Sequence, residues 1–173
     1  MSTVIEVRNA TAADAPAIAA IYRHHVLTGL ASFEVEPPDA AEIARRMDAV
    51  RALDLPYLVA LDGGEIAGYA YASVYRTRPA YRYTVEDSVY VHHARARRGI
   101  GSALMPALIA GCARAGRRQI IAVIGDSANT GSIRLHEKFG FARVGLLPDV
   151  GYKFERWVDS VLMQRALSAA DAA

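Results

Sequence analysis

The sequence predicts one mixed α/β domain, and three observations support this fold class. Segments with strand-like apolar patterns are interleaved with segments whose apolar residues recur at helical spacing. In residues 119–124, the five residues after Gln119 form a continuous apolar run, which is typical of a buried parallel strand. The chain has 173 residues, 53% of them hydrophobic, so it can build one core and is too short to suggest two. We therefore expect one domain over residues 1–167, followed by a frayed tail at residues 168–173.

Turn and cap signals divide the domain into elements. Thr11 can cap a first helix, and Asp39 and Glu42 have the spacing of a capping box. Gly29 and Gly116 are typical helix ends. We expect strands at residues 3–8, 57–61, 66–71, 83–91, 119–124 and 141–146, helices that start near residues 11, 39, 99 and 129, a break at residues 148–151 and an extended segment at residues 152–163.

The centre of the chain combines a strand, a basic glycine turn and the start of a helix. Residues 89–91 have strand character, and the apolar residues that follow Gly101 recur at helical spacing. Gly99 and Gly101 let the backbone approach a ligand, and the N–H groups of a first helical turn lack partners. Arginines at positions 95, 97 and 98 add positive charge. The stretch therefore predicts a site for a phosphate or pyrophosphate group.

Residue spacing excludes two nucleotide-binding motifs at this turn. A P-loop requires a lysine followed by Ser or Thr after its second glycine, and the chain has none there. A dinucleotide-binding fingerprint requires a third glycine, where Leu104 stands. An ordinary strand-to-helix turn remains the competing interpretation.

Composition indicates the cellular compartment and limits the classes of partner. The formal net charge of +2 is too small to predict a nucleic-acid partner. Cys112 is the only cysteine, so we expect a reducing compartment, and a buried helix position suits this residue better than a nucleophilic role. Residues 1–8 lack the pattern of an export signal, and the weakly charged run of residues 99–113 is shorter than the roughly 20 residues that cross a bilayer. We expect a cytoplasmic protein without a membrane or nucleic-acid partner.

Five short segments carry a family resemblance along nearly the whole chain. They lie at residues 32–37, 76–81, 84–91, 132–141 and 151–159. In this order they resemble the GNAT superfamily of acetyl-CoA-dependent N-acetyltransferases, and within it the branch that acetylates phosphinothricin and methionine sulfoximine. The family's turn follows a Gln/Arg-x-x-Gly-x-Gly/Ala pattern, to which Gly99 and Gly101 fit with Ala96 at the leading position. A second register would use Arg98, Gly101 and Ala103 instead.

The resemblance implies a fold, a cosubstrate and an assembly. The fold is a central twisted sheet, mixed but mostly antiparallel, of about seven strands flanked by about four helices. The cosubstrate is acetyl-CoA, and the assembly is a homodimer. Adjacent histidines do not converge on one point in a helix or strand, so no metal is expected. Contacts to the cosubstrate are implied for Val89, Tyr90, Val91, Arg97, Arg98, Gly99, Ile100, Gly101, Ser102, Asn129 and Ser132.

Acetyl transfer to an amine requires a neutral amine, stabilisation of an oxyanion and a proton for the leaving thiolate. Glu86 matches the family's glutamate and is the candidate base, directly or through a water, with a solvated strand carboxylate as the alternative. Strand alternation sends Asp87 to the opposite face, where a structural role is expected. His136 matches the branch's Leu-His-Glu motif and is either a proton donor or a hydrogen-bonded helix residue. The oxyanion is expected to meet a backbone N–H near residues 89–91, where the family's central strands splay. Asn129 contacts the pantetheine arm, caps a helix, or does both.

The substrate prediction rests on fixed cations. A small amino acid presents a carboxylate and an acidic side group, which Arg76, Arg78 and Lys153 are expected to grip. Aminoglycosides and polyamines, by contrast, would require an acidic pocket. Phe33 and Tyr81 are expected to wall the substrate cleft, although an aromatic residue on a loop is also a common lid over a core.

The leading hypothesis is an N-acetyltransferase that moves acetyl from acetyl-CoA to the α-amine of a small amino acid such as phosphinothricin or methionine sulfoximine. Within enzymes, the alternative is acetylation of another amine, including a protein N-terminus. From a different class, the chain could be a CoA-binding sensor without turnover. Retention of Glu86 and His136 favours an enzyme over a sensor.

Overall fold

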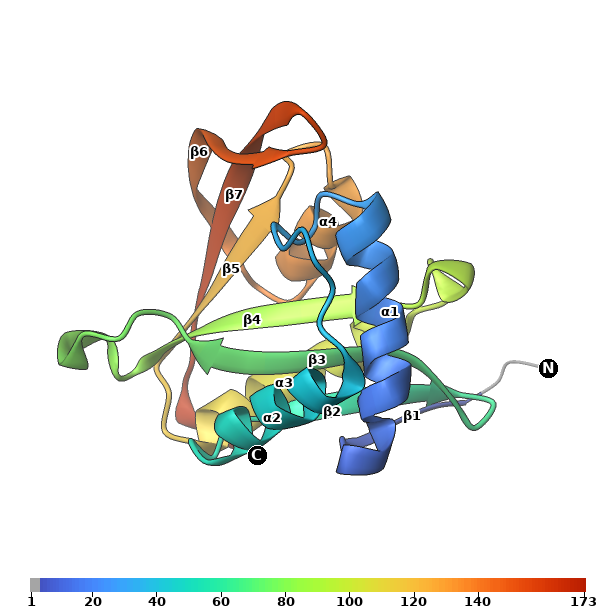
Figure 1. Cartoon of the computed structure of the whole chain (residues 1–173). Coiled ribbons are helices and arrows are strands. Elements are labelled where there is room, and N and C mark those ends of the chain that lie inside the picture. The colour runs from blue at the N-terminus through green and yellow to red at the C-terminus, as the bar shows by residue number, and fades with distance from the viewer. Residues whose placement is uncertain (1–3) are drawn as a thin grey trace.

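A computed structural model describes residues 4–173 as a seven-stranded sheet with helices on both faces (Figure 1). The strands are β1 (Ile5–Asn9), β2 (Tyr57–Asp62), β3 (Glu65–Val74), β4 (Thr84–Val91), β5 (Gln119–Gly125), β6 (Ala142–Lys153) and β7 (Arg156–Ala166). The α-helices of the described residues are α1 (Ala15–Thr28), α2 (Ala40–Arg51), α3 (Ile100–Arg114) and α4 (Thr130–Lys138). The predicted mixed α/β fold, with its strand and helix numbers, is confirmed.

The sheet contains one parallel pair, and that pair opens at one end. The strand order is β1-β2-β3-β4-β5-β7-β6, with β4 and β5 parallel and the other neighbours antiparallel. β4 and β5 are paired only as far as Asp87 and Ala122, and beyond this point the two strands diverge (Figure 1). The second half of β4 therefore has one backbone edge that faces no strand.

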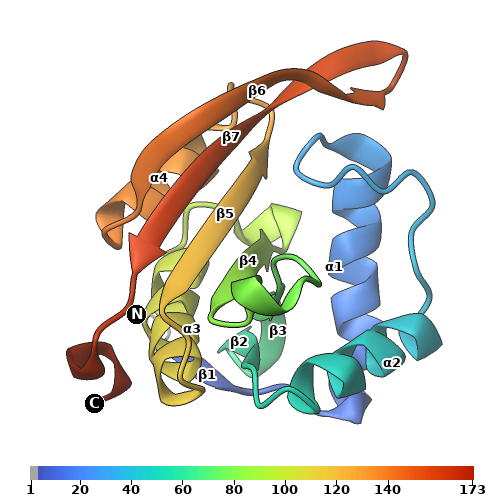
Figure 2. The same cartoon turned by 90° about the vertical axis from the view of Figure 1, so that its left-hand side faces the viewer.

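Helices cover both faces of the sheet. α3 packs across β1 to β4 on one face with α4 beside β5, whereas α1 and α2 cover the other face (Figure 2). Ile100, Leu104 and Leu108 of α3 are buried at a spacing of four residues, which directs one helix face into the core. Burial of each such side chain contributes roughly 1.5–3 kcal/mol to stability.

Most predicted element limits are confirmed. The Asp39 carboxylate accepts a hydrogen bond from the Glu42 N–H at 2.8 Å and caps α2. Gly29 ends α1, and Gly116 follows α3 in the left-handed conformation. Thr11 does not cap α1 itself, because a short 3-10 turn, Ala12–Asp14, intervenes. The first predicted strand began at residue 3, which lies outside the described residues.

The predicted break near Pro148 is wrong. β6 runs continuously from Ala142 to Lys153 and absorbs residues 148–150 as a bulge, since the register against β7 shifts between Leu147 and Gly151. The segment predicted as extended over residues 152–163 instead contains a hairpin turn at Phe154 and Glu155, both with positive φ.

The segment that was expected to be a frayed tail contains a short turn. Ala169–Ala172 forms a 3-10 turn that packs beside α3. The Asp171 carboxylate accepts hydrogen bonds from the Ser168 N–H and from the Arg165 guanidinium at 2.8 Å and 2.7 Å.

No α-helix of residues 4–173 is long and apolar enough to cross a lipid bilayer.

Candidate active site

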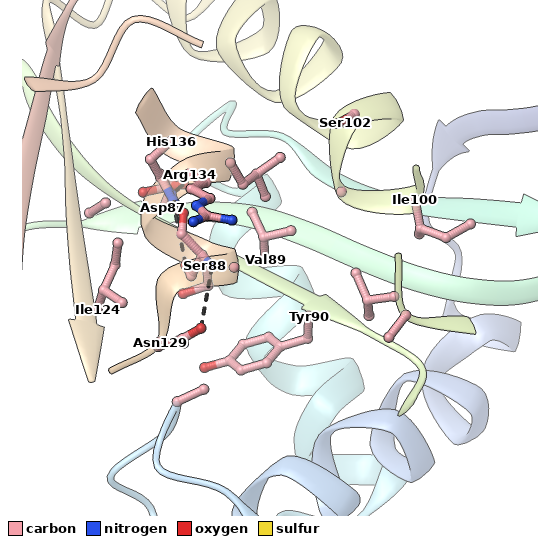
Figure 3. Close-up of a pocket in the computed structure, with 18 of the residues that line it drawn as sticks. Asp87, Ser88, Val89, Tyr90, Ile100, Ser102, Ile124, Asn129, Arg134 and His136 are labelled. Carbon is pink, nitrogen blue, oxygen red and sulfur yellow. Dashed lines mark hydrogen bonds and ion pairs between the residues drawn. The ribbon is translucent and has the colours of Figure 1, made fainter. Parts of the chain in front are cut away.

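A cavity of about 560 Å³ lies where β4 and β5 diverge. Its walls are the second half of β4, the first turn of α3, the end of β5 and one face of α4 (Figure 3). His25 of α1 and Ala31 close it from the opposite face of the sheet. The cavity therefore passes through the opening in the sheet and connects its two faces.

The glycine turn presents free amides to this cavity. Gly99 adopts φ 85°, a left-handed conformation that favours glycine, and α3 begins at the next residue. The first hydrogen bond within this helix is donated by the Ala103 N–H to the Gly99 carbonyl, so the amides of residues 100–102 have no partner within the helix. Gly101 lets α4 approach, since a Cβ there would lie 2.9 Å from the Leu135 side chain. The turn thus has the geometry of an anion site.

The three arginines of the turn have different positions. Arg95 and Arg98 both form ion pairs with the buried Asp62, at 3.1 Å, and Arg95 also pairs with Glu65. Arg97 lines the cavity in a left-handed conformation, with φ 62°. Of the residues predicted to contact the cosubstrate, Arg98 alone does not line the cavity.

Asn129 has the capping role that was one of its two predicted roles. Its side-chain oxygen accepts a hydrogen bond from the Ser132 N–H at 3.3 Å at the start of α4. Both residues line the cavity, so capping leaves room for a ligand contact.

His136 of α4 forms a buried bridge to β4 (Figure 3). Its Nε2 lies 2.9 Å from Oδ2 of Asp87, and its Nδ1 lies 2.7 Å from the carbonyl oxygen of Ser132. Both neighbours can accept hydrogen bonds, an arrangement that favours a ring with a proton on each nitrogen. Burial lowers the pKa of His136, but the hydrogen bond and charge of Asp87, together with the Ser132 carbonyl, raise it above its ordinary value.

Glu86 lies on the other side of β4 from this bridge. Asp87 is buried towards α4, and strand alternation directs Glu86 to the face covered by α1 and α2. Burial and the neighbouring Asp87 charge raise the pKa of the half-buried Glu86 carboxyl. A carboxylate held in this way is a stronger proton acceptor than one in water.

Lys153, which was predicted to bind the substrate, forms hydrogen bonds within the protein. Its side chain is buried, and its Nζ donates to the carbonyl oxygens of Gly29 and Ser32 at 2.9 Å and 2.6 Å. Burial lowers the pKa of Lys153. The ammonium group thus ties the loop after α1 to the β6–β7 hairpin.

Phe33 belongs to the same loop and packs against glycine. A Cβ at Gly151 would lie 2.4 Å from its ring, and a Cβ at Gly125 would lie 3.0 Å from it. The ring is still 40% exposed, so it both covers the β5 end and faces solvent.

The remaining predicted substrate residues lie on the exposed loop before β4. The Arg76 guanidinium lies over the rings of Tyr75 and Tyr81, at 5.2 Å and 5.8 Å from their centroids. Arg78 begins the 3-10 turn Pro79–Tyr81. None of Arg76, Arg78 and Tyr81 lines the cavity, which surrounds the opposite end of β4.

Sequence reasoning missed a polar network on the Glu86 face. The Tyr22 hydroxyl lies 2.7 Å from the Ser32 hydroxyl and donates to Glu34 at 3.0 Å, and Arg46 donates to Glu34 at 2.6 Å. The Tyr22 ring meets Tyr90 edge-on, with centroids 4.9 Å apart, and burial raises the pKa of Tyr22 to about 12. No local pattern signals this network, because its members come from four separate segments.

Two cations on the cavity wall were also missed. Arg134 and Lys138 of α4 both line the cavity, and their spacing of four residues directs them to one helix face. That spacing was available in the sequence as a signal.

The opened strand pair, the free helix amides and the cationic turn define a class of domain that holds a phosphate-bearing cosubstrate against a central strand. Comparison with known proteins makes the assignment specific. Residues 18–141 match the family model described as the acetyltransferase (GNAT) family, and the chain belongs to this family.

Several named relatives align over most of their length. The chain is 53% identical over 158 residues to phosphinothricin N-acetyltransferase of Alcaligenes faecalis, which covers 91% of this chain and 80% of the relative. It is 39% identical to the L-methionine sulfoximine/L-methionine sulfone acetyltransferase of Salmonella typhimurium. This alignment covers 93% of this chain and 94% of the relative. A crystal structure of a phosphinothricin acetyltransferase from Sinorhizobium meliloti in complex with AcCoA is 45% identical, with a TM-score of 0.91 and coverage of 97% and 90%.

Proposed function

We propose that this protein transfers acetyl from acetyl-CoA to the α-amine of a small amino acid or analogue, with phosphinothricin and methionine sulfoximine as candidate acceptors. One observation carries the proposal: β4 bears the cavity with its anion-binding turn on one side and the half-buried Glu86 on the other. The names of the relatives from Alcaligenes faecalis and Salmonella typhimurium supply the acceptor class.

The residues at the cavity fit the cosubstrate. The amides of residues 100–102 and the Arg97 side chain suit a pyrophosphate, and the apolar walls at Val89 and Ile124 suit a pantetheine arm. Acetyl-CoA supplies the activated acyl group. The edge of β4 that lacks a strand partner offers backbone N–H groups near residues 89–91 for the oxyanion.

Glu86 receives the proton of the attacking amine in this proposal, directly or through a water. Its raised pKa makes it a stronger proton acceptor than an ordinary carboxylate. His136 acts differently, as a positioning residue, because neither of its ring nitrogens is free to reach a thiolate. Its bridge to Asp87 fixes α4 against β4, and thereby positions Asn129 and Ser132 at the start of that helix.

Arg76 and Arg78 bind the acidic groups of the acceptor in this proposal. Neither has a carboxylate partner within the described residues, so both are available as cations. Lys153 instead holds the loop that carries Phe33, which walls the acceptor side.

The proposal extends to a cytoplasmic homodimer. Cys112 is buried and unpaired, which suits a reducing compartment. Six apolar side chains of the β6–β7 hairpin are each more than 50% exposed: Val144, Leu146, Val150, Tyr152, Phe154 and Trp157. Such a patch is typical of an interface. Light scattering should give twice the chain mass, and Leu146→Lys should give the monomer; a monomeric parent would refute the assembly.

A thiol-release assay tests the function. The protein is mixed with acetyl-CoA and phosphinothricin, methionine sulfoximine, ordinary amino acids or a polyamine. We expect release that depends on the amino-acid analogues and not on the polyamine. Measurable CoA binding without turnover on any acceptor would favour a sensor, and turnover on polyamines alone would refute the acceptor class.

A further inference from the structure

The cavity wall formed by α4, beside the glycine turn, carries two cations that acetyl transfer itself does not require. Arg134 and Lys138 lie one helical turn apart on α4, and both line the cavity. Figure 3 shows Arg134 extending from α4 over the cavity. Within residues 4–173, neither side chain forms an ion pair with a carboxylate. Their charges are therefore available to an anionic ligand.

Lys138 links this wall to the glycine turn. Its Nζ donates to the Ser102 hydroxyl at 3.1 Å, and Ser102 belongs to the first turn of α3, where the amides are free. The same ammonium lies 5.5 Å from the centre of the Phe139 ring. A cation in this position is beside any phosphate bound at the helix start.

The positive charge of the turn is too small to balance all the negative charge of the cosubstrate. CoA carries a pyrophosphate and, on the ribose attached to it, a separate 3′-phosphate. The turn offers amides and Arg97, whereas Arg98 is paired with Asp62 and Arg95 with both Asp62 and Glu65. This set suits the pyrophosphate. A phosphate monoester adds about −1.5 to −2 charges at pH 7, and these require further cations nearby.

We propose that Arg134 and Lys138 bind the 3′-phosphate of CoA and select acetyl-CoA over its dephospho form. The guanidinium of Arg134 can bind phosphate oxygens in a bidentate way, and Lys138 supplies a point charge beside the pyrophosphate site. The inference rests on the acetyl-CoA-dependent function and adds to it the residues that recognise the nucleotide end of the cosubstrate.

Equilibrium binding tests this without any acceptor. The affinities of CoA and dephospho-CoA are measured by titration calorimetry for the parent, Arg134→Ala, Lys138→Ala and the double variant. The parent should bind CoA about tenfold or more tightly than dephospho-CoA, as expected for about 1.4 kcal/mol from charge-assisted hydrogen bonds. In the double variant the ratio should fall to about one to two, and the CoA affinity should fall clearly more than the dephospho-CoA affinity, which still loses the contribution of Lys138 beside the pyrophosphate.

Matched variants separate recognition from damage to the fold. Arg23→Ala removes an exposed helical cation that does not line the cavity, and it should leave the ratio unchanged. Lys138→Arg keeps the charge and should keep most of the preference. Thermal unfolding checks that each variant is folded.

The outcomes are distinct. Equal weakening of both ligands would mean that the two cations serve the pyrophosphate or the fold, and it would overturn the proposal. An unchanged ratio in a folded double variant would overturn it as well. Failure of the parent to bind either ligand would instead refute the proposed function itself.

Discussion

The two sides of β4 are built in different ways. On the proposed cofactor side, the anion-binding part is one continuous segment, since β4, the turn of residues 92–99 and the first turn of α3 follow one another, and β5 and α4 complete the cavity. The acceptor side joins α1, the loop after it, α2 and the β6–β7 hairpin through side chains such as Glu34 and Lys153. One site can therefore combine a part formed by one continuous segment with a part formed by side chains from distant segments of the chain.

The largest expected effect is the fall in turnover when Glu86, which faces the acceptor side, is substituted. Glu86→Gln keeps the shape of the side chain but cannot accept the amine proton, so turnover should fall roughly 10²- to 10³-fold. Steady-state rates and calorimetric CoA binding check this. CoA affinity should stay nearly intact, because Glu86 does not line the cavity.

The pH dependence of turnover gives a second test of Glu86 as the base. Burial raises the pKa of Glu86, so the parent rate should decline as pH falls through that raised value. The residual rate of the variant should lack this decline. An unchanged turnover in Glu86→Gln would remove the residue from the mechanism.

Asp87→Asn should affect stability and the cofactor side. Loss of the carboxylate charge leaves the buried imidazolium of His136 poorly compensated, which should lower the free energy of unfolding by roughly 1–3 kcal/mol. Urea unfolding at several pH values measures it. The KM for acetyl-CoA should rise more than the KM for the acceptor, since α4 borders the cavity.

The sign of the pH dependence follows from the raised pKa of His136. Stability from this pair is fully present below the ordinary histidine pKa, near 6.5, and is lost as pH rises through the raised folded value. The difference between parent and variant should therefore shrink at alkaline pH. A constant difference from pH 6 to pH 10 would contradict the charged form of His136.

Two glycine substitutions compare the sides directly. Gly99→Ala forces a side chain into the left-handed conformation, at about 1–2 kcal/mol, and should weaken CoA binding about tenfold. Gly151→Ala would put a methyl group 2.4 Å from the Phe33 ring, and displacement of the ring should raise the acceptor KM about threefold to tenfold. Titration calorimetry and steady-state kinetics measure the two effects. Each variant is the control for the other, and a shared effect on both ligands would break the comparison.

The sequence predicted the two sides unequally for the same physical reason. Strand alternation predicted the opposite orientations of Glu86 and Asp87, and local signals predicted helix starts at Gly99 and Asn129, because these features depend on the backbone. The family resemblance, not the local pattern, singled out the residues of the acceptor side. Lys153 was predicted as a substrate cation, but two carbonyls of a loop more than 120 residues away in the chain hold its ammonium group. The bulge at residues 148–150 was also missed, because β7 continues to pair on either side of it.

The smallest expected effect concerns the exposed loop before β4. Arg76→Ala should raise the acceptor KM about threefold to fivefold, because an exposed ion pair contributes up to about 1 kcal/mol. Arg82→Ala is the matched control, since Arg82 lies on the same loop and over the ring of Tyr83, at 4.5 Å. Steady-state kinetics with varied acceptor at saturating acetyl-CoA measures both variants. A rise confined to Arg76→Ala supports a carboxylate contact, an equal rise in both implies only loop disturbance, and an effect on acetyl-CoA alone would refute the contact.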